Sequence, residues 1–157
     1  MKIIKKILLV LLVALLIAQF FRPEKNEGDI ASLNAFYSET NPPAEVKQLL
    51  EVSCNDCHSD VTRYPWYNNI TPINYWMAEH VNDGKKHFNI SKWEGSSLKR
   101  KDHKMEELIE MVEEKEMPLP SYTWTHTDAK LSEAQIKSII DWAKGVRIKY
   151  AAEKDSK

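Results

Sequence analysis

The chemically distinctive part of this sequence is one short motif, Cys54-Asn55-Asp56-Cys57-His58, which contains both cysteines of the chain. The pattern C-x-x-C-H is the attachment signature of c-type haem. If a helix continues through the motif, Cys54, Cys57 and His58 stand at positions i, i+3 and i+4 and share one face. Two thiols so placed can form thioether bonds to the two vinyl groups of a porphyrin, and the adjacent imidazole can reach the iron from the same side. The motif therefore predicts one covalently attached haem c.

Three other interpretations of the cysteine pair explain fewer features of the sequence. A structural zinc site normally takes four nitrogen or sulfur ligands, and the chain has no second cysteine pair. A thioredoxin-like redox pair is expected in a β-α-β context, which the sequence lacks. A plain disulfide between Cys54 and Cys57 suits an exported protein but leaves His58 without a role. Haem c gives all three residues a function and is the favoured interpretation.

The second axial ligand of a haem iron in electron carriers is commonly Met or His. Met117 is the preferred candidate because it ends a predicted helix directly before Pro118-Leu119-Pro120, where two prolines stiffen the loop. The methionines that fall inside predicted helices are expected to fill the core: Met77, Met105 and Met111. His126, in a loop near Met117, is the alternative ligand. Surface, solvated or capping roles are expected for His80, His87 and His103. A Met ligand raises the reduction potential, whereas a second His lowers it.

The N-terminal segment has the pattern of an export signal, a charged region followed by an apolar run. Three lysines precede residues 7–21, which read ILLVLLVALLIAQFF. The residues after Ala18 are Gln19, Phe20 and Phe21, a poor cleavage site. The stretch Ile3–Phe21 has 19 residues, and at about 1.5 Å per residue it nearly matches the bilayer core of roughly 30 Å. Residues 1–21 are therefore expected to form a retained membrane anchor, with cleavage as the alternative.

The location of the rest of the chain follows from this signal. The lysines stay on the cytoplasmic side by the positive-inside rule. The remaining chain is then expected on the periplasmic side of the bacterial inner membrane, or free in the periplasm if the segment is cleaved. Covalent haem attachment takes place on that outer side, so the signal and the motif agree.

The chain beyond the apolar segment divides into three parts. Residues 22–41 are polar and are expected to form a linker with a short docked turn at Leu33–Tyr37; residues 42–150 form the haem-binding domain, and residues 151–157 a polar tail. No stretch alternates apolar and polar residues long enough for a sheet, so the domain is predicted to be all-α. Four helices are expected: from Pro42-Pro43, from Thr71-Pro72 to a stop at Asp83-Gly84, over 97–116, and from the capping-box pattern Ser132–Gln135.

The charge of the chain argues against nucleic-acid binding. The formal net charge is −1 at pH 7, and binders of nucleic acid are usually strongly basic. Four of the 22 basic residues and none of the 23 acidic residues precede position 23, so residues 23–157 carry a net charge of −5. An acidic domain of this kind steers toward a basic partner, an effect that salt weakens.

Several further motifs follow one another along the chain in a specific order. They are Cys54-Asn55-Asp56-Cys57-His58-Ser59, Tyr64-Pro65-Trp66-Tyr67, the run from Thr71 through Trp76 and His80 to Gly84, His87-Phe88-Asn89 with Trp93, Met117-Pro118, Tyr122, His126 and Ala129-Lys130-Leu131-Ser132. With them, the chain from about Val46 to Tyr150 resembles the bacterial haem-binding domain family of small exported proteins with one c-type haem. The resemblance implies a cytochrome c-like helical fold with His58 and Met117 as axial ligands, and it implies no known reaction.

Two features near the motif are left open by the sequence. Typical cytochromes c have a proline about a dozen residues after the haem histidine, whereas here Pro65 and Pro72 lie 7 and 14 residues after His58. The carbonyl group that orients His58 is therefore not predicted. An aromatic cluster is expected either to line the haem pocket or to belong to the ordinary core: Tyr64, Trp66, Tyr67, Tyr75 and Trp76.

Two functional classes fit a single-haem protein. The favoured one is a membrane-tethered electron carrier with His/Met-ligated iron that exchanges electrons with a redox partner protein. The alternative is a haem-based enzyme or sensor that binds a peroxide or a diatomic gas at a displaceable sixth position. The sequence has no evident catalytic constellation, which favours the carrier.

Overall fold

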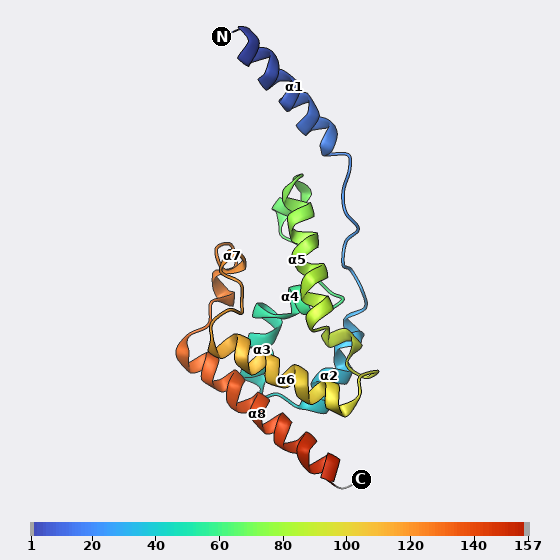
Figure 1. Ribbon diagram of the computed structural model, residues 1–157, viewed down its shortest axis with the longest axis vertical. Coiled ribbons are helices and arrows are strands. Elements are labelled where there is room, and N and C mark those ends of the chain that lie inside the picture. Colours follow the sequence, from blue (N-terminus) through green and yellow to red (C-terminus); the bar gives the residue numbers. More distant parts are fainter. Residues whose placement is uncertain (1, 156–157) are drawn as a thin grey trace.

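The computed structural model describes residues 2–155, and these residues contain helices and no strand. Figure 1 shows one helix, α1 (Lys2–Ala18), standing away from a helical domain formed by the rest of the chain. The one isolated bridge between extended residues in this part of the chain joins Glu27 and Val61. The prediction of an all-α domain is confirmed.

The domain is built from helices of unequal length. Its α-helices are α2 (Asn34–Thr40), α3 (Ala44–Ser53), α4 (Asn55–His58), α5 (Ile73–His87), α6 (Leu98–Glu113), α7 (Pro120–Thr123) and α8 (Glu133–Asp155). Its single-turn 3-10 helices are η1 (Ile30–Leu33), η2 (Trp66–Asn69), η3 (Ile90–Lys92) and η4 (Thr127–Ala129). The helices α3, α5, α6 and α8 correspond to the four that the sequence predicts.

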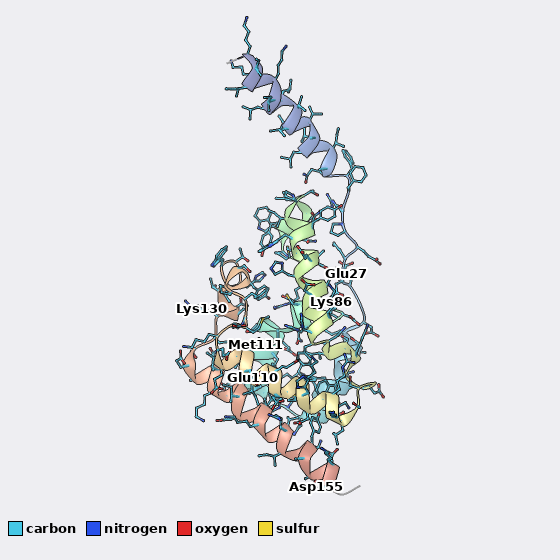
Figure 2. The ribbon with its side chains drawn as sticks, in the orientation of Figure 1. Glu27, Lys86, Glu110, Met111, Lys130 and Asp155 are labelled. Carbon is cyan, nitrogen blue, oxygen red and sulfur yellow. The ribbon has the colours of Figure 1, made fainter. Side chains whose placement is uncertain are left out.

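The helix α1 has no buried residue. Figure 2 shows its side chains projecting on all sides, with no other element packed around them. Within residues 2–155, no helix combines the length and the apolarity expected of a membrane span. Met1, the first residue of the expected anchor, lies outside the described residues.

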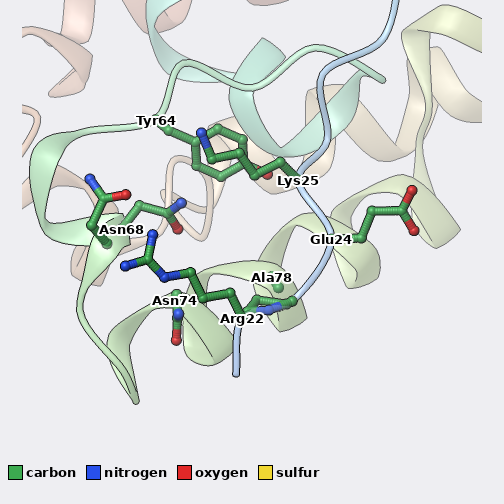
Figure 3. A pocket seen from close by; sticks show the side chains of 9 residues that line it. Arg22, Glu24, Lys25, Tyr64, Asn68, Asn74 and Ala78 are labelled. Atoms are coloured by element: carbon green, nitrogen blue, oxygen red, sulfur yellow. The ribbon is translucent and has the colours of Figure 1, made fainter. Parts of the chain in front are cut away.

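The end of α1 is attached to the domain by a pair of hydrogen bonds. The side-chain amide of Gln19 donates to the backbone oxygen of Thr71 at 3.0 Å, and its oxygen accepts from the Thr71 N–H at 2.9 Å. The segment that follows runs beside η2 and α5, and a cavity of about 80 Å³ lies between them. Figure 3 shows Arg22 and Asn68 among the side chains that line it. The ring of Tyr64 lies at the same cavity, under the ammonium group of Lys25.

Part of the segment 22–41 is packed against the domain, and the docked turn expected at Leu33–Tyr37 lies in this part. Its backbone pairs with the residues after the motif, since Gly28 N–H donates to Asp60 O at 2.7 Å and Thr62 N–H donates to Asn26 O at 3.0 Å. Leu33 and Phe36 are both buried in the main core, three residues apart on adjoining turns. An apolar pair at this spacing can cover the core from one side. The packed domain therefore begins well before residue 42.

The centre of the domain is the packing of α6 against α8, with α3 beside them (Figure 1). The apolar stripe of α6 is buried at Met105, Ile109 and Val112, and that of α8 is buried at Ile139, Ile140, Ala143 and Val146. The predicted capping box opens α8. The Ser132 N–H donates to the Gln135 side chain at 2.8 Å, and the Gln135 N–H donates to the Ser132 hydroxyl at 3.4 Å.

The ends of two helices differ from the expectation. The helix α5 runs through the expected stop at Gly84 to His87. The helix α8 continues to Asp155, so residues 151–155 of the expected tail are helical. These five residues, AAEKD, include four good helix formers, which explains the extension. Residues 156–157 of that tail lie outside the described residues.

A buried polar cluster joins α2, α6 and α8. Lys101 donates to Glu39 Oε2 at 2.6 Å, and the Tyr150 hydroxyl donates to Glu39 Oε1 at 2.7 Å. Burial raises the pKa of Glu39, but the bonds from Lys101 and Tyr150 outweigh burial and leave this pKa below its usual value. The cluster holds the end of α2 to the core.

Replacing Phe36 by alanine is expected to destabilise the domain by about 3–5 kcal/mol. The Phe36 side chain is fully buried, and its ring contacts those of Tyr37, Phe88, Trp93 and Trp142 at centroid distances of 5.4, 6.0, 4.9 and 6.1 Å. Chemical denaturation followed by circular dichroism measures the change. Ile30→Ala, at an exposed side chain of the same segment, is the control and should cost less than about 0.5 kcal/mol. Equal losses in the two variants would show that the segment is not part of the core.

Candidate functional site

The motif forms its own helical turn directly after α3. The helix α3 ends at Ser53, and Cys54 leaves the helical region with φ −126° and ψ −44° before α4 begins at Asn55. The helix thus does not continue through Cys54 as the spacing argument assumed. The backbone oxygen of Cys54 nevertheless accepts from both Cys57 N–H at 3.2 Å and His58 N–H at 2.9 Å. These two bonds close a backbone turn that contains Cys54, Cys57 and His58.

The two cysteines are free thiols that lie half-buried in the domain. Burial raises the pKa of Cys54 to about 12, with a smaller effect from the charge of Cys57. Burial likewise raises the pKa of Cys57 to about 11, helped by the carboxylate of Asp56. Cysteines that react as redox pairs usually have a lowered pKa and act as thiolates. The surroundings of this pair keep both groups protonated at neutral pH and give no support to a thioredoxin-like role.

The imidazole of His58 is oriented by the backbone at the end of α5. Its Nδ1 lies 3.0 Å from the carbonyl oxygen of Phe88. A carbonyl oxygen only accepts, so Nδ1 carries the hydrogen and Nε2 has a free lone pair. Burial lowers the pKa of His58, against the opposing effect of the Phe88 and Gly84 carbonyls. The side chain is thus a neutral imidazole in the tautomer that metal-binding histidines use, and the orienting carbonyl belongs to neither of the two prolines.

The helix α5 packs against the motif at Gly84. A Cβ atom at this position would lie 2.5 Å from the backbone oxygen of Cys57 and 3.1 Å from its Cβ. Glycine is therefore present because the backbones of α4 and α5 approach each other closely. This contact sets the distance between the cysteine turn and the helix that supplies the Phe88 carbonyl.

Gly84→Ala is expected to destabilise the domain and to reduce haem incorporation, because the clash is with backbone atoms that cannot rotate away. Gly145→Ala is the matched control, since it lies inside α8 with open space around its Cβ. The control should gain up to about 1 kcal/mol from helix propensity alone. Thermal unfolding of the two purified variants and the ratio of haem to protein measure the difference. A gain in stability in both variants would contradict the close approach.

The candidate sixth ligands lie on a separate segment between α6 and α8. Met117 is half-buried in the loop after α6, where its N–H and that of Glu116 both bond to the Met111 oxygen at 3.0 Å; Met111 is labelled at this end of α6 in Figure 2. The ring of His126 stacks on that of Tyr122 at 4.1 Å, and its Nδ1 lies 3.2 Å from the Tyr122 oxygen. The segment thus carries both candidates, as the sequence indicates.

Of the three methionines expected to fill the core, only Met105 does so. Met105 is fully buried in the core, and Met77 and Met111 are half-buried within helices. His80 bonds through Nδ1 to the Trp76 oxygen one turn earlier, at 2.8 Å. His103 is exposed beside Glu106 and Glu107, and His87 is exposed at the end of α5.

The predicted aromatic cluster is divided between two surroundings. Tyr64 contacts the segment 22–41, where its hydroxyl accepts from Asn26 N–H at 2.7 Å. Trp66, Tyr75 and Trp76 are exposed by 75%, 46% and 47%. Tyr67 joins η2 to the loop after α7, since its hydroxyl donates to Thr125 at 2.8 Å. Large aromatic side chains left uncovered in this way are typical of a surface that another molecule covers.

Asp56 of the motif belongs to a polar cluster that the sequence did not predict. Asp56, between the two cysteines, is buried and accepts hydrogen bonds from Arg63 and from Tyr122. These residues are separated by up to 66 positions along the chain, and no local pattern marks them as partners. The acidic residue at position 56 was the one sequence feature that could have indicated such a cluster.

The site residues fit a haem in their chemistry. Two neighbouring protonated thiols, a neutral imidazole with free Nε2 and uncovered aromatic side chains are the groups needed to attach, ligate and cover a porphyrin. The cavity of Figure 3 lies apart from this site, since none of Cys54, Cys57, His58 and Met117 lines it. Among residues 2–155, no group of three or more His, Cys, Asp or Glu side chains is arranged to bind a metal ion.

Comparisons with known proteins agree with this chemistry at the level of the family. Searches of curated protein sequences and of solved structures give no significant match. A family model described as the haem-binding domain matches residues 13–145. The match begins within α1, includes the motif and the Met117–His126 segment, and ends within α8. The chain therefore belongs to the haem-binding domain family.

Proposed function

We propose that the protein carries one covalent haem c, bound through Cys54 and Cys57 and ligated by His58. In forming each thioether, the thiol adds across a vinyl double bond, so that one S–C bond forms and the thiol hydrogen moves to the other vinyl carbon. This addition needs no oxidant. The observation that carries the proposal is the His58 Nδ1–H bond to the Phe88 oxygen, which leaves the lone pair on Nε2, in a turn whose two cysteines are free thiols.

The proposed sixth ligand is Met117, with His126 as the alternative. The Met117–His126 segment supports this choice because hydrogen bonds tie it to the motif and to η2. The Tyr122 hydroxyl donates to Asp56 Oδ2 at 2.7 Å, and the Tyr67 hydroxyl donates to Thr125 at 2.8 Å. The thioether of Met117 needs no protonation change to bind. The contact of His126 Nδ1 with the Tyr122 oxygen leaves Nε2 of His126 available, which is why His126 is the alternative.

With both axial positions filled, the function that fits best is electron transfer. The bound iron supplies a one-electron couple, and a Met ligand sets it toward higher potential than a second His. The chain's own residues hold the group rigidly and leave aromatic edges such as Trp66 and Trp124 exposed. The net charge of −5 over residues 23–157 favours a redox partner protein with a basic surface.

The proposed location is the periplasmic side of the bacterial inner membrane, with the N-terminal segment as its anchor, or the periplasm if the segment is cleaved. The support comes from the lysines before the apolar run and from the exposed apolar side chains along α1. A helix that is apolar all round normally buries its surface in protein or in lipid. Fractionation of expressing cells, with the intact mass of the mature chain, tests this assignment.

The experiment that tests the function is spectroscopy on protein expressed with the cytochrome c maturation machinery. A carrier should show low-spin ferric haem with a Met–iron charge-transfer band and should bind cyanide slowly. High-spin iron that binds cyanide or carbon monoxide readily would instead indicate an enzyme or sensor with a displaceable sixth ligand. A haem stain of the denatured protein reports covalent attachment separately.

A further inference from the structure

The carboxylate of Asp56 is the most heavily bonded side chain of the motif. Its side chain is only 5% exposed. Oδ1 accepts from the backbone N–H of Arg63 at 3.0 Å and from its Nε at 3.1 Å, while Oδ2 accepts from Arg63 Nη2 at 3.0 Å. A guanidinium that bonds both oxygens of a carboxylate fixes the plane of that carboxylate. Asp56 is therefore a rigid acceptor placed between the two cysteines.

The fourth bond to Asp56 comes from the segment that carries the candidate sixth ligands. The Tyr122 hydroxyl donates to Asp56 Oδ2 at 2.7 Å and lies 3.2 Å from the backbone oxygen of Val52 at the end of α3. Tyr122 is five residues after Met117 and four before His126. A bond at this position limits how far either candidate can move relative to the motif.

Apart from the Tyr67–Thr125 bond to η2, few contacts hold this segment near Tyr122. The helix α7 is a single turn with no buried residue, and Trp124 beside it is 77% exposed. Short turns without buried apolar contacts open at low free-energy cost. Hydrogen bonds to a buried charged group are stronger than neutral ones. The Tyr122 bond is thus the contact best suited to keep the segment closed over the motif.

We propose that Tyr122 is a positioning residue, which holds the Met117–His126 segment at the motif through Asp56 and thereby keeps the sixth ligand on the iron. Arg63 contributes by fixing the acceptor. The proposal rests on the proposed function, because it assumes that a ligand from this segment completes the coordination. It assigns the stability of that coordination to one hydroxyl group.

The test is Tyr122→Phe, which keeps the ring and removes the hydroxyl. Tyr150→Phe is the matched control, since the Tyr150 hydroxyl also donates to a carboxylate at 2.7 Å, in the cluster that joins α2, α6 and α8. We expect Tyr122→Phe to raise the rate of cyanide binding to the ferric protein at least tenfold and to weaken the Met–iron band. Amides 117–126 should exchange hydrogen at least tenfold faster. The control should lower the unfolding midpoint without either change.

The outcomes separate this proposal from the proposed function. If wild-type protein has Met-ligated haem and the two variants behave alike, Tyr122 is not a positioning residue. If the wild type lacks covalent haem, the proposed function fails, while hydrogen exchange at 117–126 still decides whether Tyr122 holds the segment. Faster exchange confined to Tyr122→Phe supports that holding role, and equal exchange in both variants overturns it.

Discussion

The double variant Cys54→Ser/Cys57→Ser is expected to contain no covalently bound haem. Serine has nearly the size of cysteine but does not add to a vinyl group, so the change removes the attachment chemistry and little packing. Haem staining after denaturing electrophoresis and the intact mass of the exported chain measure the effect. The wild type should keep its prosthetic group through denaturation, and the variant should lose all of it.

The single variants extend this experiment. Each should retain one thioether and one unreacted vinyl group, which remains conjugated with the porphyrin and moves the reduced pyridine haemochrome band to longer wavelength. The haemochrome band of either single variant should therefore lie at longer wavelength than that of the wild type. Covalent haem in the double variant would rule out the proposed attachment, and a wild type without haem would rule out the proposed function.

Replacing Met117 by alanine is expected to change the iron more than any other single substitution outside the motif. Loss of the thioether should abolish the Met–iron charge-transfer band and open a position for cyanide or carbon monoxide. It should also lower the reduction potential by on the order of 0.1–0.3 V, a part of the roughly 0.8 V range that axial ligands cover. Optical titration at controlled potential measures the charge-transfer band and the reduction potential.

His126→Ala is the discriminating control for Met117→Ala. If Met117 is the ligand, His126→Ala should keep the charge-transfer band and nearly the same potential, because His126 then only stacks on Tyr122. If the two variants exchange these outcomes, His126 is the ligand. A third variant, His103→Ala, removes an exposed histidine on α6 and should leave the spectrum unchanged.

The parts of the fold that the sequence predicts are those that depend on local patterns. The stripe through Met105, Ile109 and Val112 repeats with the period of a helix, and the capping box at Ser132 is confined to four residues. Such patterns can be recognised in the sequence because the residues that form them are close together in the chain. The all-α architecture and the helices α3, α5, α6 and α8 followed from them.

The parts that the sequence did not predict depend on contacts between distant residues. Gly84 looked like a helix stop, but it is needed for the approach of α5 to Cys57. Phe36 lies in the turn that was expected to dock, but the rings that bury it, those of Phe88, Trp93 and Trp142, were not predicted. The Phe88 carbonyl that orients His58 comes from 30 residues further along the chain. Only the folded chain brings these groups together.

The stretch of chain that connects α1 to the domain is bonded to the domain at both of its ends. The Gln19–Thr71 pair fixes one end of this stretch, and the Gly28–Asp60 bond fixes the other. These bonds at both ends of the stretch restrain the orientation of the domain relative to the end of α1. If the protein exchanges electrons as proposed, this restraint would fix the direction in which the domain presents its surface to a partner.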